Sequence, residues 1–467
     1  MAASLRLLCK VTNRFQINWK SSFSLLKSTK RYFLSETYSC NDAWNKYLQD
    51  PTLKKISLSD FAYQIQEQLQ KDGMVSAVDI NVLAHQLQQL DEDEAEFMED
   101  ILAKFSLCQN SLPRCDATYH AIVYGYLAAG LSDRLPPLLT DRLTYGIFPN
   151  HYTLNLLLDY FIKHEQIASA AKMSYLSMLQ EDFTNPITTL LSLYATVNHL
   201  LTSNIDDLAL PPVQPVEGEE EKWIKVKYIK FPHYDDHFDI KDERFLLGKT
   251  LLYLAKSQSV SIPKELCNSL KVIGSGLYHK FTKGLEYLES IANSPDGVIS
   301  QHALNYFTQS LEKVEARDPN EPEVEIGLRT IDDVIHRLLP TTDEKLEYQT
   351  VLSKVEERLK TSGKVVADYD LGQVVKELVV SNLAQLEPAD ISAQLKLFDT
   401  WTQNRKEELE KQVFEYEKNL RIEEMKVQIK ELKEKEEILT YFDNEEKLRL
   451  KFLEEDLAKD KNLTISQ

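Results

Sequence analysis

Two stretches of the chain contain residue types that can bind phosphate or metal ions. Gly248-Lys249-Thr250 resembles the end of a phosphate-binding loop, but that loop needs a glycine five residues before Gly248, where the chain has Glu243. The stretch from His233 to Asp239 has metal-capable side chains, but no second ligand group lies nearby in sequence, so we interpret it as the polar tip of a hairpin. The sequence therefore predicts no catalytic centre, no metal site and no cofactor, and a protein that is not an enzyme.

Another chemistry open to this chain is the neutralisation of nucleic-acid phosphates by basic side chains. In the middle of the chain the candidates are Arg134, Arg142, Lys163 and Lys172. Further on, apolar residues alternate with lysines in a strand-like stretch that contains Lys222, Lys225, Lys227 and Lys230. Two interpretations of that stretch stay open: an RNA-binding patch, and a solvated edge strand whose lysines prevent aggregation.

The elements that would position these side chains follow a repeated pattern. Thr118, Thr153 and Thr188 are 35 residues apart, and each opens an apolar run with helical spacing. A constant period in this range is typical of stacked helical hairpins, which bury their apolar faces against neighbouring hairpins. The clear units are 116–150 and 151–185. We expect the three threonines to occupy equivalent positions, and the inner surface of the array to be free for a partner.

This hairpin plan resembles the pentatricopeptide repeat, an RNA-reading helical hairpin. Several segments are similar to one family in particular, the pentatricopeptide-repeat proteins of the mitochondrial small ribosomal subunit (the S-twenty-seven family). They are Lys30 to Ser35, Tyr145 to Pro149, Tyr152-Thr153, Asn155 to Leu157, Asp159 to Lys163 and Leu190 to Tyr194, with a weaker similarity from Leu371 to Trp401. The resemblance implies an all-α repeat solenoid that contacts ribosomal RNA.

The resemblance also implies which side chains face the RNA. In the repeat family the fifth and last residues of each unit read one base, which pairs His120 with Asn150 and Asn155 with Asn185. An Asn–Asn pair can both donate to and accept from a base edge. His120 departs from the family's usual code, and Leu190, at the fifth position of the third unit, cannot hydrogen-bond a base. The alternative is that Asn150 and Asn185 only close the hairpins and that Asn155 faces a neighbouring helix.

The first 35 residues differ from the rest of the chain. They contain seven basic residues, six serines and no acidic residue, which is the pattern of a mitochondrial transit peptide. The whole chain has a formal net charge of −19, so without this leader the net charge would be −26. Because such a charge opposes general RNA binding, we expect RNA to meet a limited face and other proteins to cover much of the remainder. No apolar run approaches ~18 residues, so the sequence predicts no membrane span.

The remainder of the chain is also predominantly helical by pattern. The segments 371–383 and 391–401 are expected to form a helix pair joined at Glu387-Pro388, with Asp390 capping the second helix. From Gln403 to Lys461 there is neither proline nor glycine, and apolar residues form two short heptad seams: Leu409, Val413, Tyr416 and Leu420, then Ile422, Met425, Ile429 and Leu432. Such a helix is suited to docking on a partner, the alternative being a single solvated helix with a frayed end.

Together these patterns predict an all-α helical-hairpin solenoid with a small β insertion and a long charged C-terminal helix. The expected organisation is a transit peptide (1–35), N-terminal helices with a degenerate repeat (36–115), pentatricopeptide repeats (116–200), a loop and β insertion (201–243), a C-terminal helical region (244–402) and a long charged helix (403–467).

The resemblance implies a non-catalytic component of the mitochondrial ribosomal small subunit, in the matrix. Its partners would be small-subunit ribosomal RNA and neighbouring ribosomal proteins, with tRNA or mRNA as further candidates. The RNA-contact candidates are His120, Asn150, Asn155, Asn185, Arg142, Lys163, Lys172, Lys225 and Lys227. Two alternatives stay open: a free RNA-binding repeat protein that acts in RNA processing or translational activation, and a helical scaffold that binds only proteins.

Overall fold

The computed structural model describes residues 33–50, 53, 56–111, 115–203, 240–320, 336, 339–442 and 444–465. The predicted β insertion, with Lys225 and Lys227, and nearly all of the predicted transit peptide lie outside these ranges. The chain forms two compact units, and the boundary between them falls inside one helix, after Lys396. Of the described residues, 78% are helical, which confirms the predicted all-α class.

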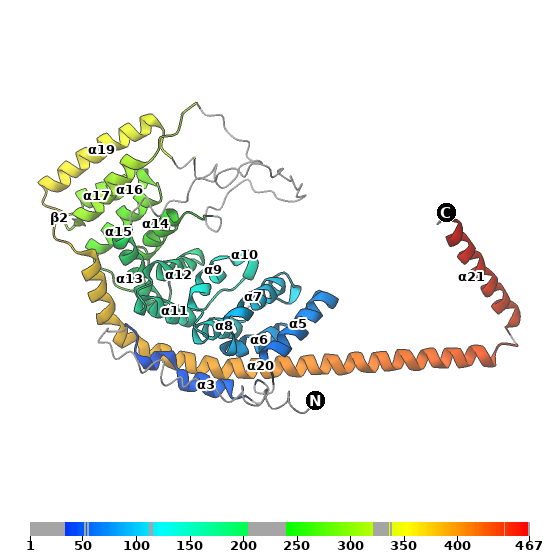
Figure 1. The fold of residues 1–467 in the computed structure, drawn as a ribbon. Helices are drawn as coiled ribbons and strands as arrows, with labels where there is room; N and C mark the ends of the chain where they lie inside the picture. The colour runs from blue at the N-terminus through cyan, green and yellow to red at the C-terminus, as the bar shows by residue number, and fades with distance from the viewer. Residues whose placement is uncertain are drawn as a thin grey trace. The chain divides into compact units, whose positions relative to one another are not determined.

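The larger unit is a stack of helical hairpins, ordered along the chain as Figure 1 shows. Two short N-terminal helices, η1 (Glu36–Ser39) and α3 (Asn41–Leu48), and then α5 (Leu58–Asp72) precede the stack. The first helices of the successive hairpins are α6 (Ala77–Gln86), α8 (Asp116–Ala128), α11 (His151–Lys163), α13 (Pro186–Thr202), α15 (Lys264–Leu277) and α17 (Gln301–Lys313). The second helices are α7 (Glu92–Ser106), α9 (Leu135–Thr140) with α10 (Arg142–Tyr145), α12 (Ile167–Leu179), α14 (Glu243–Leu254), α16 (Phe281–Asn293) and α19 (Thr342–Thr361).

Neighbouring hairpins pack through like helices. First helices meet as α6 on α8, α11 on α13 and α15 on α17, and second helices meet as α9 on α12 and α12 on α14. Because α14 packs on both α12 and α13, it pairs with α13 to form the fourth hairpin, although residues 204–239 lie between the two helices in the chain. The hairpin stack therefore continues past that segment, as far as α19.

Short connecting elements complete the unit. They are the 3₁₀ turns η2 (Leu87–Gln89), η3 (Gln109–Ser111) and η4 (Ser132–Arg134), and a two-stranded parallel sheet of β1 (Ile299–Ser300) and β2 (Val365–Val366). The sheet pairs Ile299 with Val365. It joins the start of α17 to the end of α19 and is separate from the predicted β insertion.

Left-handed backbone positions recur with the period of the repeat. Gly130 and Gly146 have φ of 78° and 62°, and the residues 35 positions later, Glu165 and Glu181, have φ of 63° and 54°. Glycine enters this region without steric cost, whereas a residue with a Cβ is strained there. The hairpin geometry thus imposes the same turns on both units, although only the first unit supplies glycine.

The last helix of the larger unit corrects a prediction. α20 runs from Leu371 to Leu439 without interruption and contains Pro388, so the predicted helix pair joined at Glu387-Pro388 is wrong. The missing N–H of a proline removes a single helical hydrogen bond. On either side of Pro388, the side chains of Glu387 and Asp390 bond to the hairpin unit, so α20 stays in contact with the hairpins as it passes the proline.

The second unit begins at Leu397 within α20 and includes α21 (Glu445–Ile465). Its exposed surface carries short-range ion pairs such as Lys411–Glu408 and Lys426–Glu423, both at 2.7 Å. Six of the eight seam residues, Val413, Tyr416, Leu420, Met425, Ile429 and Leu432, are 46–65% exposed. A long charged helix is present as predicted, although it ends at Leu439 and is followed by the separate helix α21, and its apolar seam lies at the surface.

Candidate nucleic-acid interface

The three repeated threonines occupy equivalent positions, as predicted. Each lies in the first turn or two of a first helix, is nearly or fully buried, and bonds to a side chain of the preceding hairpin. Asn81 Nδ2 donates to Thr118 Oγ1 at 2.9 Å, His120 Nδ1 lies 2.9 Å from Thr153 Oγ1, and Thr188 Oγ1 donates to Asn155 Oδ1 at 2.7 Å. These bonds form a polar ladder between successive first helices, which sets their spacing within an otherwise apolar core.

Asn150 and Asn185 act as helix caps. The Oδ1 of Asn150 accepts from Thr153 N at 3.0 Å and from Thr153 Oγ1 at 2.7 Å, and the Oδ1 of Asn185 accepts from Ile187 N and Thr188 N. An asparagine at this position satisfies N–H groups that have no partner within the helix. The alternative interpretation, in which these residues close the hairpins, describes this geometry.

His120 and Asn155 lie in the interior, at 2% and 0% exposure. Burial lowers the pKa of His120 to about 3, with a smaller contribution from His85, so the ring is neutral at physiological pH. Asn155 bonds to Thr188 on one side and, through Nδ2, to the hydroxyl of Tyr38 at 2.9 Å on the other. A base cannot reach either side chain while this packing persists.

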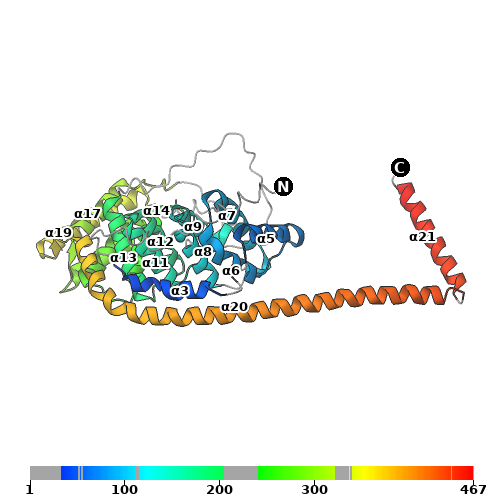
Figure 2. The same cartoon turned by 60° about the horizontal axis from the view of Figure 1, so that its bottom comes forward.

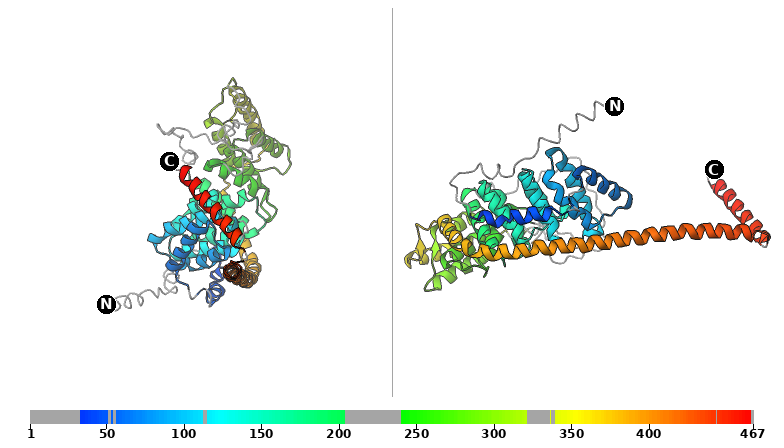
Figure 3. Two further views of the ribbon diagram at one scale, coloured as in Figure 1. Left: turned by 90° about the vertical axis from the view of Figure 1, so that its right-hand side faces the viewer. Right: turned by 90° about the horizontal axis from the view of Figure 1, so that it is seen from below.

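The face of the first helices that carries His120 and Asn155 is occupied by the chain's own N-terminal segment, so it is not the free partner surface that was expected. Tyr38 packs on Tyr152, with ring centroids 5.3 Å apart, and Trp44 of α3 meets His120 edge to face at 4.7 Å. Leu34 N donates to Asp159 Oδ1 at 3.2 Å. In Figure 2 and in the right panel of Figure 3, α3 lies across the first helices.

The first part of α20 reinforces this contact through two carboxylates. Ser35 Oγ donates to Glu387 Oε2 at 2.6 Å, and Asn185 Nδ2 donates to Asp390 Oδ1 at 3.3 Å. The Tyr38 hydroxyl donates to the other oxygen of Asp390. Burial and the negative charge of Asp390 hold the pKa of Tyr38 well above its usual value. Asp390 was expected to cap a helix; instead it joins α20 to both η1 and α13.

The basic candidates of the array lie beside carboxylates. Lys163 forms an ion pair with the buried Asp159, and Lys172 attracts the carboxylate of Glu243. Arg134 Nε lies 3.3 Å from Glu99 Oε1. Arg142, in α10, is half-buried. Because the buried carboxylate of Asp159 already compensates Lys163, this lysine contributes little net attraction for phosphate.

A cluster of basic residues that sequence reasoning missed lies between α14, α15 and α16. It includes Lys249, which we had considered only as part of a phosphate-binding loop, together with Lys256, Lys280 and Lys283. The sequence does contain a signal for this cluster: Lys249 and Lys256 are seven residues apart, a spacing that places both on one face of a helix. Within the described ranges, no group of three His, Cys, Asp or Glu side chains could hold a metal ion. The same residues include no helix with the length and apolarity to cross a membrane.

Comparison with known proteins agrees with the fold. The family described as "Mitochondrial 28S ribosomal protein S27" matches residues 1–431 of this chain. The match covers every hairpin of the larger unit and most of α20. The chain therefore belongs to the mitochondrial 28S ribosomal protein S27 family, a family of the mitochondrial small ribosomal subunit.

Proposed function

We propose that this protein is a non-catalytic component of the mitochondrial small ribosomal subunit, in the matrix, that contacts ribosomal RNA and neighbouring proteins and so supports translation. The observation that carries the proposal is the family match over residues 1–431. The basic, acid-free first 35 residues support import into mitochondria. The side chains expected to read bases are hydrogen-bonded inside the protein. The protein would therefore contact RNA through small basic areas of its surface.

The second unit supports the binding of partner proteins. Its helix α20 presents exposed apolar residues at heptad intervals, including Val413, Tyr416 and Leu420. Helical seams of this kind are used for packing against another helix. The net charge of −19 also favours a protein that meets RNA over a small area and other proteins over a larger one.

Gradient sedimentation of a mitochondrial extract tests this proposal. The protein should migrate with the small subunit, and it should move to lighter fractions when ribonuclease dismantles that subunit. A free RNA-processing factor would sediment apart from the small subunit. A scaffold that binds only proteins would show no crosslinked nucleotide after ultraviolet irradiation of the intact subunit. Absence from the small-subunit fractions would reject the proposal.

A further inference from the structure

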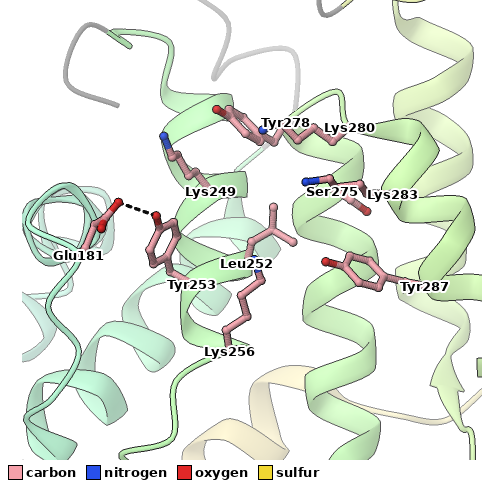
Figure 4. A pocket seen from close by; sticks show the side chains of 10 residues that line it. All are labelled: Glu181, Lys249, Leu252, Tyr253, Lys256, Ser275, Tyr278, Lys280, Lys283 and Tyr287. Carbon is pink, nitrogen blue, oxygen red and sulfur yellow. Dashed lines mark hydrogen bonds between the residues drawn. The ribbon is translucent and has the colours of Figure 1, made fainter. Parts of the chain in front are cut away.

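A cavity of about 250 Å³ opens between α14, α15 and α16 of the larger unit. Figure 4 shows the lining residues on α14, with Glu181 beside Tyr253, and on α15 and α16 opposite. The residues that carry charge or an aromatic hydroxyl are Glu181, Lys249, Tyr253, Lys256, Tyr278, Lys280, Lys283 and Tyr287. This combination of lysines and tyrosines is unlike the acidic composition of the chain as a whole.

Among the described residues, lysine is the most frequent charged residue in the lining. Four lysines face one carboxylate, Glu181, and that carboxylate accepts a 2.8 Å hydrogen bond from the hydroxyl of Tyr253. Lys256 and Lys283 are exposed at the mouth, whereas Lys249 is only 8% exposed. The cavity thus presents ammonium groups both at its entrance and within its wall, in a chain whose net charge is −19.

The helix crossing places these groups. A Cβ on Gly248 would lie 2.9 Å from both Gly274 O and Tyr278 N, so α14 and α15 approach here backbone to backbone. This contact brings Lys249 Nζ to 5.6 Å from the Tyr278 ring centroid. Lys280 Nζ lies 4.4 Å from the same centroid. Gly248 therefore allows the close approach of α14 and α15, and this approach places Lys249 beside the ring of Tyr278.

The ring itself is held by core packing. Tyr278 belongs to a buried cluster with Ile240 and Phe245, and its ring centroid lies 6.0 Å from that of Phe245. A fixed ring between two lysines is a rigid wall for a ligand. The N-terminal turn of α16, which carries Lys283, adds the positive end of a helix dipole.

We propose that this cavity binds a nucleotide phosphate group. Lysine binds phosphate as a point charge with three donors, and tyrosine rings can stack on the attached base. The volume is below the range of about 300–1,000 Å³ that is typical for pockets enclosing a whole small ligand, so the cavity fits a phosphate group while the rest of the nucleotide stays outside. The phosphate belongs either to single-stranded RNA or to a free mononucleotide. The assignment of the phosphate to RNA rests on the proposed function. The proposal that the cavity binds a phosphate group rests only on the residues that line it.

Direct binding by the full chain tests the proposal. The probe is a fluorescent single-stranded RNA of about twelve nucleotides, measured by anisotropy over a range of salt concentrations. The variant K256Q/K283Q removes two exposed lysines at the mouth, and K264Q/K354Q removes two exposed lysines on α15 and α19 that do not line the cavity. We expect K256Q/K283Q to weaken binding about tenfold at low salt. The slope of log K against log salt should fall by about 1.4, since each lost contact with single-stranded RNA removes about 0.7. The control should retain the wild-type slope.

Competition identifies the source of the phosphate. If inorganic phosphate and unlabelled RNA displace the probe but AMP and ATP do so no better than phosphate, the ligand is RNA. If ATP or AMP displaces the probe at concentrations where inorganic phosphate does not, the ligand is a mononucleotide. As a second variant, K249Q should also weaken binding, with its melting temperature recorded to show that it is folded.

Equal affinities and slopes for K256Q/K283Q, its control and the wild type would overturn the proposal, as would the absence of probe binding at low salt. That failure is separable from a failure of the proposed function. If the wild type migrates with the small subunit but the cavity variants bind the probe normally, only the cavity assignment is rejected.

Discussion

The hydroxyl of Tyr38 lies 2.9 Å from Nδ2 of Asn155, although the two residues are 117 positions apart in the chain. Asn155 occupies the position at which a pentatricopeptide repeat would read a base. The N-terminal segment therefore covers a side chain that the sequence predicts to contact RNA. This relationship and the contacts around it lead to four predictions on stability.

The Tyr38 hydroxyl should be a large contributor to the stability of the hairpin unit. Y38F removes the donor to Asp390 and the acceptor for Asn155 at once. Because the buried amide of Asn155 and the half-buried carboxylate of Asp390 both lose this bond, the free energy of unfolding should fall by about 1–3 kcal/mol. Urea denaturation measures the change. Tyr63 is 64% exposed, so Y63F should stay within about 0.5 kcal/mol of the wild type. Equal values for the two variants would contradict the assigned bonds.

The threonine ladder gives a second prediction. T188V keeps the shape of the side chain but removes the hydroxyl that donates to Asn155 Oδ1 at 2.7 Å. The loss should be about 1–3 kcal/mol, because the acceptor is buried, whereas T188S should restore most of it. T202V is the matched control, since the Thr202 hydroxyl bonds only to its own helix at the surface. A denaturation midpoint for T188V that matches T202V would show that the ladder does not stabilise the stack.

Stability should depend on pH through buried histidines. Burial lowers the pKa of His120 to about 3, and burial followed by the charge of Arg244 lowers the pKa of His279 to about 4. Between these values and about 6.5 the unfolded chain binds protons that the folded protein does not. Folding is therefore favoured above pH 6.5, and stability is lost as the pH falls toward 4. H120Q should reduce the slope of unfolding free energy against pH in this window by up to about 1.4 kcal/mol per pH unit. An unchanged slope would contradict a buried neutral His120.

A glycine in place of Glu165 should stabilise the protein at its left-handed turn. Its φ of 63° matches that of Gly130, 35 residues earlier, and E165G supplies the residue that this conformation favours. Removing the strain caused by the Cβ should raise the free energy of unfolding by about 1 kcal/mol. The greater conformational entropy of glycine in the unfolded chain offsets part of this gain. In contrast, E96G at an exposed position in α7 should lower it by about 1 kcal/mol. Thermal denaturation distinguishes the two, and a destabilised E165G would show that this turn is not strained.

The fold was predictable because its signals are local and repeated. Thr118, Thr153 and Thr188 marked equivalent helix starts at a constant spacing, and a period in sequence becomes a period in structure when each hairpin packs on the next. The caps at Asn150 and Asn185 follow from the same local rule. The helix break predicted at Pro388 is wrong, because tertiary contacts of Glu387 and Asp390 outweigh the cost of one lost helical hydrogen bond. These contacts are with residues far away in the chain, so the local sequence does not predict them.

The sequence by itself determined the helical class, the length of the repeat and the family, since helix periodicity and capping depend on residues a few positions apart. Only the tertiary structure decided what the repeat surface faces. Tyr38 meets Asn155, and Lys249 lies beside the ring of Tyr278, because helices far apart in the chain pack at particular crossings. Those crossings depend on close contacts such as Gly248 on Gly274, and no local pattern specifies which distant helix will supply the partner.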